Sequence, residues 1–277
     1  MFTLNCNGKI INLNSAVVMG IINITPDSFF EGHLNKKESE LLMMAEGMID
    51  HGASILDIGG QSTKPGSKRI DADEELNRVI PIIKAIKKHF PEIIISIDSY
   101  YSKVAAHAIE SGADIVNDIS AGNLDADMIR TVGKLKVPYV CMHMQGTPET
   151  MQLNPTYNNI TLEIIQFFIK KIEACRMAGI NDIIIDPGFG FGKTIEQNFT
   201  LLRELLSLKM LGCPILAGVS RKGMIYKTLE TTPENALNGT TVANTLALIN
   251  GASILRVHDV KEAKEAIDIF NAFIRIP

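Results

Sequence analysis

Short apolar runs recur along the chain, and each is followed at once by a polar residue. Interpreted as buried strands, the runs cover residues 16–22, 54–56, 93–97, 114–116, 139–142, 183–185, 215–219 and 254–255. The polar residues that follow them are Asn23, Asp57, Asp98, Asn117, His143, Asp186, Ser220 with Lys222, and Arg256 with His258. Between the runs, apolar residues at helical spacing predict helices at about 37–51, 73–89, 101–112, 124–135, 158–178, 195–209, 233–250 and 259–275.

This alternation predicts an α/β protein, a single-domain (β/α)8 TIM barrel that spans residues 1–277. In such a barrel the carboxyl ends of all the strands converge on one mouth, where the active site lies. The main rival is an open doubly wound sheet, which is disfavoured because the chain has eight strand–helix units and no G-x-G-x-x-G loop. Residues 2–13 predict an N-terminal β-hairpin around Asn7-Gly8 that closes the bottom of the barrel. Glycines that suit left-handed helix caps follow several helices: Gly52, Gly112, Gly179, Gly212 and Gly251.

Composition and charge narrow the class of protein. With 277 residues, of which 46% are hydrophobic, the chain can bury a large core. A net charge of −4 with interspersed signs gives no basic stripe for nucleic acid. No apolar run approaches membrane-spanning length, and no cationic segment with an apolar stretch opens the chain. Four cysteines without metal-binding spacing suggest reduced thiols, so we expect a cytoplasmic protein that binds neither nucleic acid nor membrane.

Three segments carry unusual chemistry for connecting loops. Residues 23–32 and 59–69 are rich in Gly, Pro and Ser and contain hydroxyls or cations. Residues 186–194, DPGFGFGKT, combine three glycines with two phenylalanines directly after a strand-end acid. This third segment lacks the spacing of a phosphate-binding Walker loop. Since long loops at a barrel mouth usually carry binding groups, all three are predicted to border the active site.

Buried acids at the same mouth are costly unless they are paired. Asp98, Asn117 and Asp186 all end apolar runs, and each one taken alone could be a structural residue. Together with Lys222 and Arg256, they favour a ligand with a planar edge of hydrogen-bond donors and acceptors. The 2-amino-4-oxo edge of a pterin or a guanine has this pattern.

Two further features indicate an anion site. Arg256 and His258 are two residues apart at the end of a strand, so they face the same side. Barrels often bind phosphate in this region, and the pair favours an anion ligand over a structural histidine. Asn23 could be a ligand to Mg²⁺, a cation that prefers oxygen donors and keeps waters and phosphate oxygens around it.

In their order along the chain, several strings closely resemble the dihydropteroate synthase family, a group of pterin-binding TIM barrels. The strings are NITPDSF at 23–29, DIGGQSTKPG at 57–66, SIDSY at 96–100, NDIS at 117–120, MHMQGTP at 142–148, DPGFGFGKT at 186–194, GVSRKG at 218–223 and LRVHDV at 255–260. The family joins 4-aminobenzoate to 6-hydroxymethyl-7,8-dihydropterin diphosphate and releases pyrophosphate, on the route to folate. The resemblance implies a transferase, a bound Mg²⁺ and a homodimer.

The resemblance also implies roles for individual residues. Asn23 would hold Mg²⁺ on the pyrophosphate. The pterin pocket would be lined by Asp98, Asn117, Asp186 and Lys222, with apolar walls from Ile119 and Met142. Arg256 would stack on the pterin and, with His258 and Thr63, would grip the diphosphate. The 4-aminobenzoate would be bordered by Pro65, Phe191 and the segment from Ser220 to Lys222.

The chain departs from the family pattern in its second loop, which commonly reads E-S-T-R-P-G. Gln61 and Lys64 stand in place of the acid and the arginine. Lys64 keeps the charge but cannot form the bidentate contact of an arginine. In the reaction that the resemblance implies, Asp98 and Asp186 would stabilise a pterin cation. The departing anion would be stabilised by Mg²⁺, Arg256, His258 and Lys64. No nucleophilic side chain is then needed.

Two alternatives from other classes remain open. A pterin-binding methyltransferase that serves a corrinoid protein would share the pterin-reading acids but would not need Ser220, Lys222 or the Arg256 and His258 pair. A catalytically silent homologue would be expected to have lost some of the strand-end groups, and none is missing from the sequence.

Overall fold

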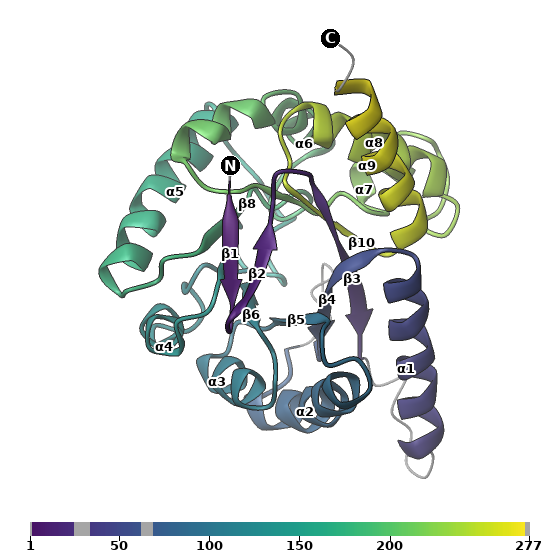
Figure 1. Ribbon diagram of the computed structural model, residues 1–277. Helices are drawn as coiled ribbons and strands as arrows, with labels where there is room; N and C mark the ends of the chain where they lie inside the picture. The colour runs from purple at the N-terminus through teal and green to yellow at the C-terminus, as the bar shows by residue number, and fades with distance from the viewer. Residues whose placement is uncertain (1, 25–33, 62–68, 275–277) are drawn as a thin grey trace.

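The computed structural model describes residues 2–24, 34–61 and 69–274, and for 34–37 only the backbone is described. Within these residues, eight parallel strands form the wall of a barrel, in the order β8-β7-β6-β5-β4-β3-β10-β9. A parallel bridge between Ile185 and Ile215 joins β8 to the segment that enters β9, so the sheet closes. The strands are β3 (Val17–Asn23), β4 (Ala53–Gly59), β5 (Ile94–Asp98), β6 (Ile115–Asp118), β7 (Tyr139–Met142), β8 (Ile183–Asp186), β9 (Leu216–Ala217) and β10 (Ile254–Val257) (Figure 1). The predicted TIM barrel is confirmed.

Helices surround the barrel, as Figure 1 shows. In the described residues they are α1 (Leu34–Asp50), α2 (Ala72–His89), α3 (Ser102–Glu110), α4 (Met128–Leu135), α5 (Ile160–Met177), α6 (Ile195–Arg203), the 3₁₀ helix η2 (Leu205–Leu211), α7 (Gly223–Tyr226), α8 (Leu237–Ile249) and α9 (Val260–Ile274). Capping side chains define where several of these helices begin. Asp71 accepts a hydrogen bond from the backbone of Glu74, and Thr194 forms a reciprocal capping box with Gln197, as expected for helix N-termini.

The interior of the barrel has an apolar floor at the amino-terminal ends of the strands. Each of the eight strands contributes one buried residue to this cluster: Met19, Ile55, Ile94, Ile115, Val140, Ile184, Leu216 and Ile254. The N-terminal hairpin of β1 (Thr3–Cys6) and β2 (Lys9–Asn12) adds Leu4 and Cys6 to it. Asn7 and Gly8 both have positive φ, 53° and 90°, as a tight hairpin turn requires. The predicted hairpin and its place below the barrel are therefore confirmed.

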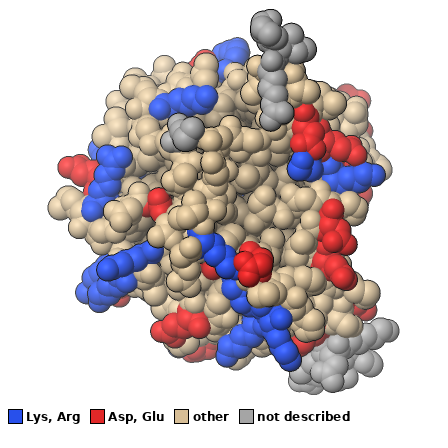
Figure 2. All heavy atoms as spheres, viewed as in Figure 1, with Lys and Arg blue, Asp and Glu red and all other residues tan. Residues whose placement is uncertain are grey.

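The face that carries the hairpin is mostly uncharged, although it includes the ion pair between Lys9 of β2 and Glu92 at 3.6 Å. Figure 2 shows it as a mostly tan surface, with Lys and Arg and Asp and Glu interspersed mainly toward its edge. Among the helices of the described residues, none combines the length and the apolar character that are needed to cross a membrane.

Some predicted boundaries were wrong, each for a local reason. The strand containing Asp57 continues to Gly59, so Asp57 lies inside β4. The helix predicted from residue 124 begins only at Met128, because the Asp125 carboxylate accepts hydrogen bonds from the backbone of Ser102 and Asp127 in a competing turn. The helix predicted at 195–209 ends at Arg203 and continues as the 3₁₀ helix η2. The four-residue α7 was not predicted.

Candidate active site at the barrel mouth

Arg256, from the end of β10, reaches across the mouth and binds two acids from other strands. Its Nε donates to Asp57 Oδ2 and its Nη2 to Asp98 Oδ2, both at 2.6 Å. Asn117 Nδ2 donates to the same Asp57 Oδ2 at 3.0 Å. Asp57 is fully buried, and its Oδ1 has no hydrogen-bond partner. Side chains from β4, β5, β6 and β10 thus form one polar network in the mouth.

Burial dominates the electrostatics of this network. It raises the pKa of Asp98 to about 7, against the opposing effect of Arg256 and with support from the neighbouring Asp57. The pKa of Asp186 is also raised by burial, which outweighs the nearby charge of Lys222. Burial acts against protonation of Arg256, but Asp57 and Asp98 outweigh it and raise the pKa of the guanidinium. The mouth therefore holds Asp98, which titrates near neutral pH, and Asp186, whose pKa lies above its usual value.

Lys222 lies beside Asp186 in the same mouth. Burial lowers the pKa of Lys222 to about 8, although the charge of Asp186 opposes this. Its Nζ donates to the carbonyl oxygen of Phe189 and lies 4.7 Å from the centre of the Phe191 ring. A Cβ at Gly218 would lie 3.8 Å from Lys222 Nζ and 4.0 Å from Asp186 Oδ2. Glycine at this position therefore leaves room between the end of β9 and the two charged groups.

An apolar wall adjoins the acids. Tyr100, Ile119 and Met142 form a small buried cluster, against which the ring of Phe191 packs. Tyr100 OH donates to Gln61 Oε1 at 2.9 Å, and the same oxygen accepts from the backbone of Ile70 at 2.9 Å. Gln61 thus acts as an acceptor that holds the base of the second loop, a task that a glutamate at this position would also perform.

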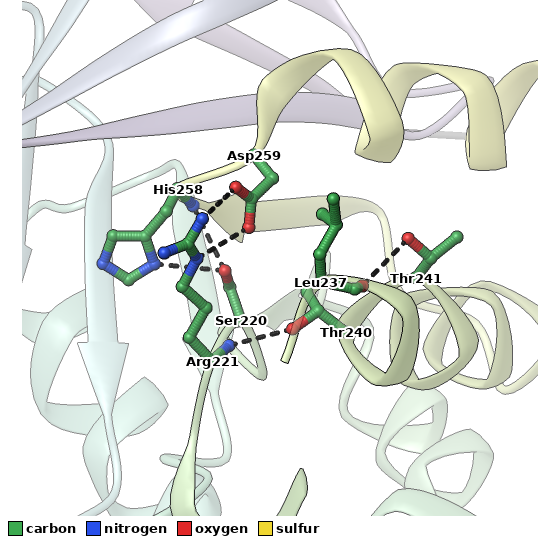
Figure 3. A network of polar contacts seen from close by, with 7 residues as sticks. All are labelled: Ser220, Arg221, Leu237, Thr240, Thr241, His258 and Asp259. Atoms are coloured by element: carbon green, nitrogen blue, oxygen red, sulfur yellow. Dashed lines mark hydrogen bonds and ion pairs between the residues drawn. The ribbon is translucent and has the colours of Figure 1, made fainter. Parts of the chain in front are cut away.

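A second polar group of residues lies at the rim, beside Lys222. Ser220 Oγ lies 3.1 Å from His258 Nδ1 and accepts from the backbone of His258 at 3.2 Å. Arg221, in the left-handed region at φ 54°, forms a bidentate pair with Asp259 at 3.0 and 2.6 Å, as Figure 3 shows. The imidazole of His258 is exposed, yet desolvation by its neighbours, followed by the charges of Arg256 and Arg221, lowers its pKa.

Asn23 ends β3 with an exposed side chain. A Cβ at Gly59 would lie 3.6 Å from Asn23 Oδ1 and 3.7 Å from Asp98 Oδ2, so the two oxygens face each other across a residue without a side chain. Within the part of the chain that the structure describes, no three His, Cys, Asp or Glu side chains gather in a way that would hold a metal ion. The donors at Asn23 fit a cation that brings most of its ligands with it, as Mg²⁺ does with a diphosphate.

The structure brings together most of the residues that the sequence predicted for the site. The residues that lie in the mouth or on its rim are Asn23, Asp98, Asn117, Ile119, Met142, Asp186, Phe191, Ser220, Lys222, Arg256 and His258. Thr63, Lys64 and Pro65 lie outside the described residues. Sequence reasoning placed Asp57 at a strand end but missed its contact with Arg256, for which the chain gives no local signal. It also missed the buried contact between Lys193 and His143 at 3.1 Å.

Comparisons with known proteins agree with this geometry. The sequence profile of a family described as pterin binding enzyme matches residues 19–258. The dihydropteroate synthase of Escherichia coli K12 is 39% identical over 267 residues, which are 96% of this chain and 94% of that protein. The Yersinia pestis dihydropteroate synthase, solved with a sulfonamide drug complex, superposes with a TM-score of 0.93 at 37% identity, covering 99% of this chain and 100% of that one. The Xanthomonas albilineans enzyme with 4-aminobenzoic acid gives 0.92 at 38% identity, covering 99% of both chains.

Proposed function

This chain belongs to the pterin-binding enzymes, among them to the dihydropteroate synthases, and we infer from this membership and from the mouth of the barrel what it does. It is a transferase of folate biosynthesis. It condenses 6-hydroxymethyl-7,8-dihydropterin diphosphate with 4-aminobenzoate to give 7,8-dihydropteroate and pyrophosphate. The observation that carries the assignment of roles is the convergence of Asp57, Asp98, Asn117, Asp186 and Lys222 around Arg256 in one mouth.

We propose that the polar network reads the pterin. The carboxylates of Asp98 and Asp186 accept N–H bonds from the pterin edge, and the amide of Asn117 serves a mixed donor and acceptor edge. Lys222 donates to a pterin oxygen or nitrogen, and Ile119 and Met142 cover the ring. Arg256 stacks on the ring while Asp57 keeps its guanidinium oriented.

In the reaction, the bond between the methylene carbon and the diphosphate oxygen breaks, and the carbon then bonds to the aniline nitrogen, which loses a proton. Loss of pyrophosphate leaves positive charge spread over the dihydropterin, and Asp98 and Asp186 stabilise it from fixed positions. Arg256, His258, Thr63 and Lys64 hold the departing anion. The negative charge of the bound pyrophosphate would raise the pKa of His258 and favour the charged form of the imidazole.

The second substrate binds next to this pocket in our proposal. Phe191, Pro65 and the segment from Ser220 to Lys222 border the 4-aminobenzoate ring, and Phe191 already lies against Lys222. Since Gly223 has no side chain, only its backbone N–H is offered there to the carboxylate of this substrate.

Mg²⁺ is the proposed cofactor. Asn23 would hold it, with diphosphate oxygens and waters as its other ligands. When bound, Mg²⁺ neutralises charge that develops on the departing pyrophosphate.

We further propose a cytoplasmic homodimer. The four cysteines are free and buried, in keeping with a reducing compartment. Exposed apolar residues on α8, among them Val242, Leu246 and Ile249, form a face of the kind that subunits bury. Sedimentation would show a dimer, and Leu246→Glu should dissociate it; a monomer at all concentrations would contradict the proposal.

The experiment that tests the function measures pyrophosphate release from the pterin diphosphate with and without 4-aminobenzoate. Release that depends on 4-aminobenzoate, with 7,8-dihydropteroate as product, is the expected outcome. Pterin binding without release would instead favour a silent homologue. Methyl transfer to a corrinoid protein would favour the methyltransferase alternative.

A further inference from the structure

The loop after β8, residues 187–192, is held almost entirely by side chains. The carbonyl oxygens of successive residues each have a partner, although the loop belongs to no helix or sheet. In chain order, the partners are Lys193 Nζ for Gly188 at 2.8 Å, Lys222 Nζ for Phe189, Gln152 Nε2 for Gly190 at 2.6 Å, Lys193 Nζ for Phe191 at 2.9 Å and Tyr157 OH for Gly192 at 2.9 Å. The pairing of these five successive carbonyls gives the segment one defined shape.

Lys193 is the central donor in this set. Its side chain is 3% exposed, and it forms no ion pair with any described carboxylate. Its three ammonium hydrogens have three close acceptors, because Nζ also lies 3.1 Å from His143 Nδ1. A lysine has three donors and no acceptor capacity, so the ammonium is satisfied without a counter-ion. Burial lowers the pKa of Lys193 well below its usual value, against the opposing charge of Asp186. A lysine in this place is therefore costly to keep charged, so it serves a purpose other than stability.

Lys193 connects the ends of two neighbouring strands. His143 directly follows β7, and its backbone N–H donates to Asp186 at the end of β8. Its ring packs edge-on against Phe167, with the ring centroids 4.9 Å apart, and its Nδ1 lies 3.1 Å from Lys193 Nζ. A Cβ at Gly188 would lie 1.9 Å from the His143 carbonyl oxygen, so the loop backbone is seated directly on the segment after β7.

The far side of the same loop faces the candidate active site. The Phe189 carbonyl accepts from Lys222, and the Phe191 ring lies under the Lys222 ammonium at 4.7 Å. Phe191 also packs against the wall of Tyr100, Ile119 and Met142. Displacing the loop by a fraction of an ångström would therefore move both groups that contact Lys222.

We propose that Lys193 is a positioning residue: its buried ammonium ties loop 187–192 to the end of β7 and thereby holds the Phe191 ring and the Phe189 carbonyl in place for Lys222 and the 4-aminobenzoate ring. The inference rests on the proposed function, in which Phe191 and Lys222 border that substrate. Lys193 itself touches no substrate and acts through Phe191.

The test replaces Lys193 by methionine, which is similar in length and has no hydrogen-bond donor. Lys87→Met is the matched control, since Lys87 also binds a carbonyl, that of Ile93, and Asp114, but at the closed end of the barrel. For Lys193→Met we expect the KM for 4-aminobenzoate to rise at least about tenfold. The KM for the pterin diphosphate should change by less than about threefold, because Asp98, Asn117 and Asp186 still bind the pterin. Lys87→Met should lose stability and change neither KM.

A double-mutant cycle separates positioning from a general structural effect. In a Phe191→Ala background, Lys193→Met should raise the 4-aminobenzoate KM by less than about threefold, because the group through which it acts is gone. An unchanged KM in the single variant, equal rises for both substrates, or the same rise in both backgrounds would each overturn the proposal. If Lys193→Met does not fold, Lys193→Gln takes its place. Because Gln keeps an N–H donor, a smaller rise in the 4-aminobenzoate KM is expected, which must still exceed the change in the pterin diphosphate KM and must disappear in the Phe191→Ala background. Absence of turnover in the unmodified enzyme would instead contradict the proposed function.

Discussion

Asp57 and Arg256 are 199 residues apart in the chain, yet Asp57 Oδ2 accepts a hydrogen bond from Arg256 Nε at 2.6 Å. The guanidinium is held on a second side by Asp98. Two contacts of this kind fix the plane of the group, so Arg256 enters the reaction with its orientation set. Asp57 therefore acts on the substrate through Arg256, and its other oxygen is buried without a hydrogen-bond partner.

From this contact we predict that Asp57→Asn lowers turnover at least about tenfold, which corresponds to a rise of about 1.4 kcal/mol in the activation free energy. The amide keeps the shape of the side chain but removes the charge that orients Arg256. Asp114→Asn is the matched control, because Asp114 is an equally buried partner of Lys87 at the closed end of the barrel. Both variants should lose stability, by up to about 3 kcal/mol, which thermal unfolding would measure. Equal turnover in the two variants would contradict the role of Asp57.

Lys222→Ala should also cut turnover at least about tenfold while the protein remains folded. The reason is its position beside Asp186 and the Phe189 carbonyl, where the alanine variant would lose both the positive charge and the N–H donor. Steady-state kinetics provide the measurement, and Lys227→Ala, at an exposed position one helical turn further on, is the control. Near-normal kinetics for Lys222→Ala would remove this residue from the site.

The pH dependence of kcat/KM should be bell-shaped. Asp98, with a pKa of about 7, must be ionised to stabilise a cation, so activity should rise as pH increases through 7. Lys222, with a pKa of about 8, must be charged, so activity should fall as pH increases through 8. Because Asp98 and Lys222 interact, the apparent pKa values of the two limbs belong to the coupled pair and not to either residue alone.

Lys222→Arg identifies the alkaline limb. Arginine does not titrate in this range, so the variant should keep the acid limb and lose the alkaline one, whatever its absolute rate. An alkaline limb that persists unchanged in this variant would assign it to another group.

Magnesium should bind weakly to the protein alone and well in the presence of pyrophosphate. Asn23 supplies one neutral oxygen, and the described residues offer no cluster of acids to hold the ion by themselves. Titration calorimetry with and without pyrophosphate measures both affinities. Asn23→Ala should weaken only the binding seen with pyrophosphate; tight binding of Mg²⁺ to the bare protein, or full activity in excess chelator, would count against the proposed role.

The barrel was predictable because each strand is a short apolar run that ends in a polar residue, and this pattern repeats eight times. The hairpin was predictable from Asn7-Gly8 between two short apolar-rich segments. The starts of α4 and α7 were not, because they depend on local hydrogen bonds such as those of Asp125. In the site, the strand-end position of Asp98, Asn117 and Asp186 was readable from the sequence, since it follows from the geometry of parallel strands.

The contacts between side chains inside the mouth could not be predicted from the sequence in the same way. Nothing local in the chain says that Arg256 binds Asp57, or that Lys193 is buried against His143. Both contacts cross the barrel or join neighbouring loops, so they depend on tertiary structure. Sequence reasoning treated Lys193 as the end of a glycine-rich string, whereas its contacts show that it organises that string.

The hairpin below the barrel also affects the chemistry of the mouth, because it excludes water from the closed end of the barrel. With Leu4 and Cys6 sealed onto the apolar floor, the acids of the mouth can be hydrated from above only, and this one-sided hydration is part of why the pKa of Asp98 rises and that of Lys222 falls. If water entered from below, both values would move back toward those of exposed groups, and the working pH range would widen on both sides. Two short strands that contact no substrate thus help to set the acidity at which the enzyme works.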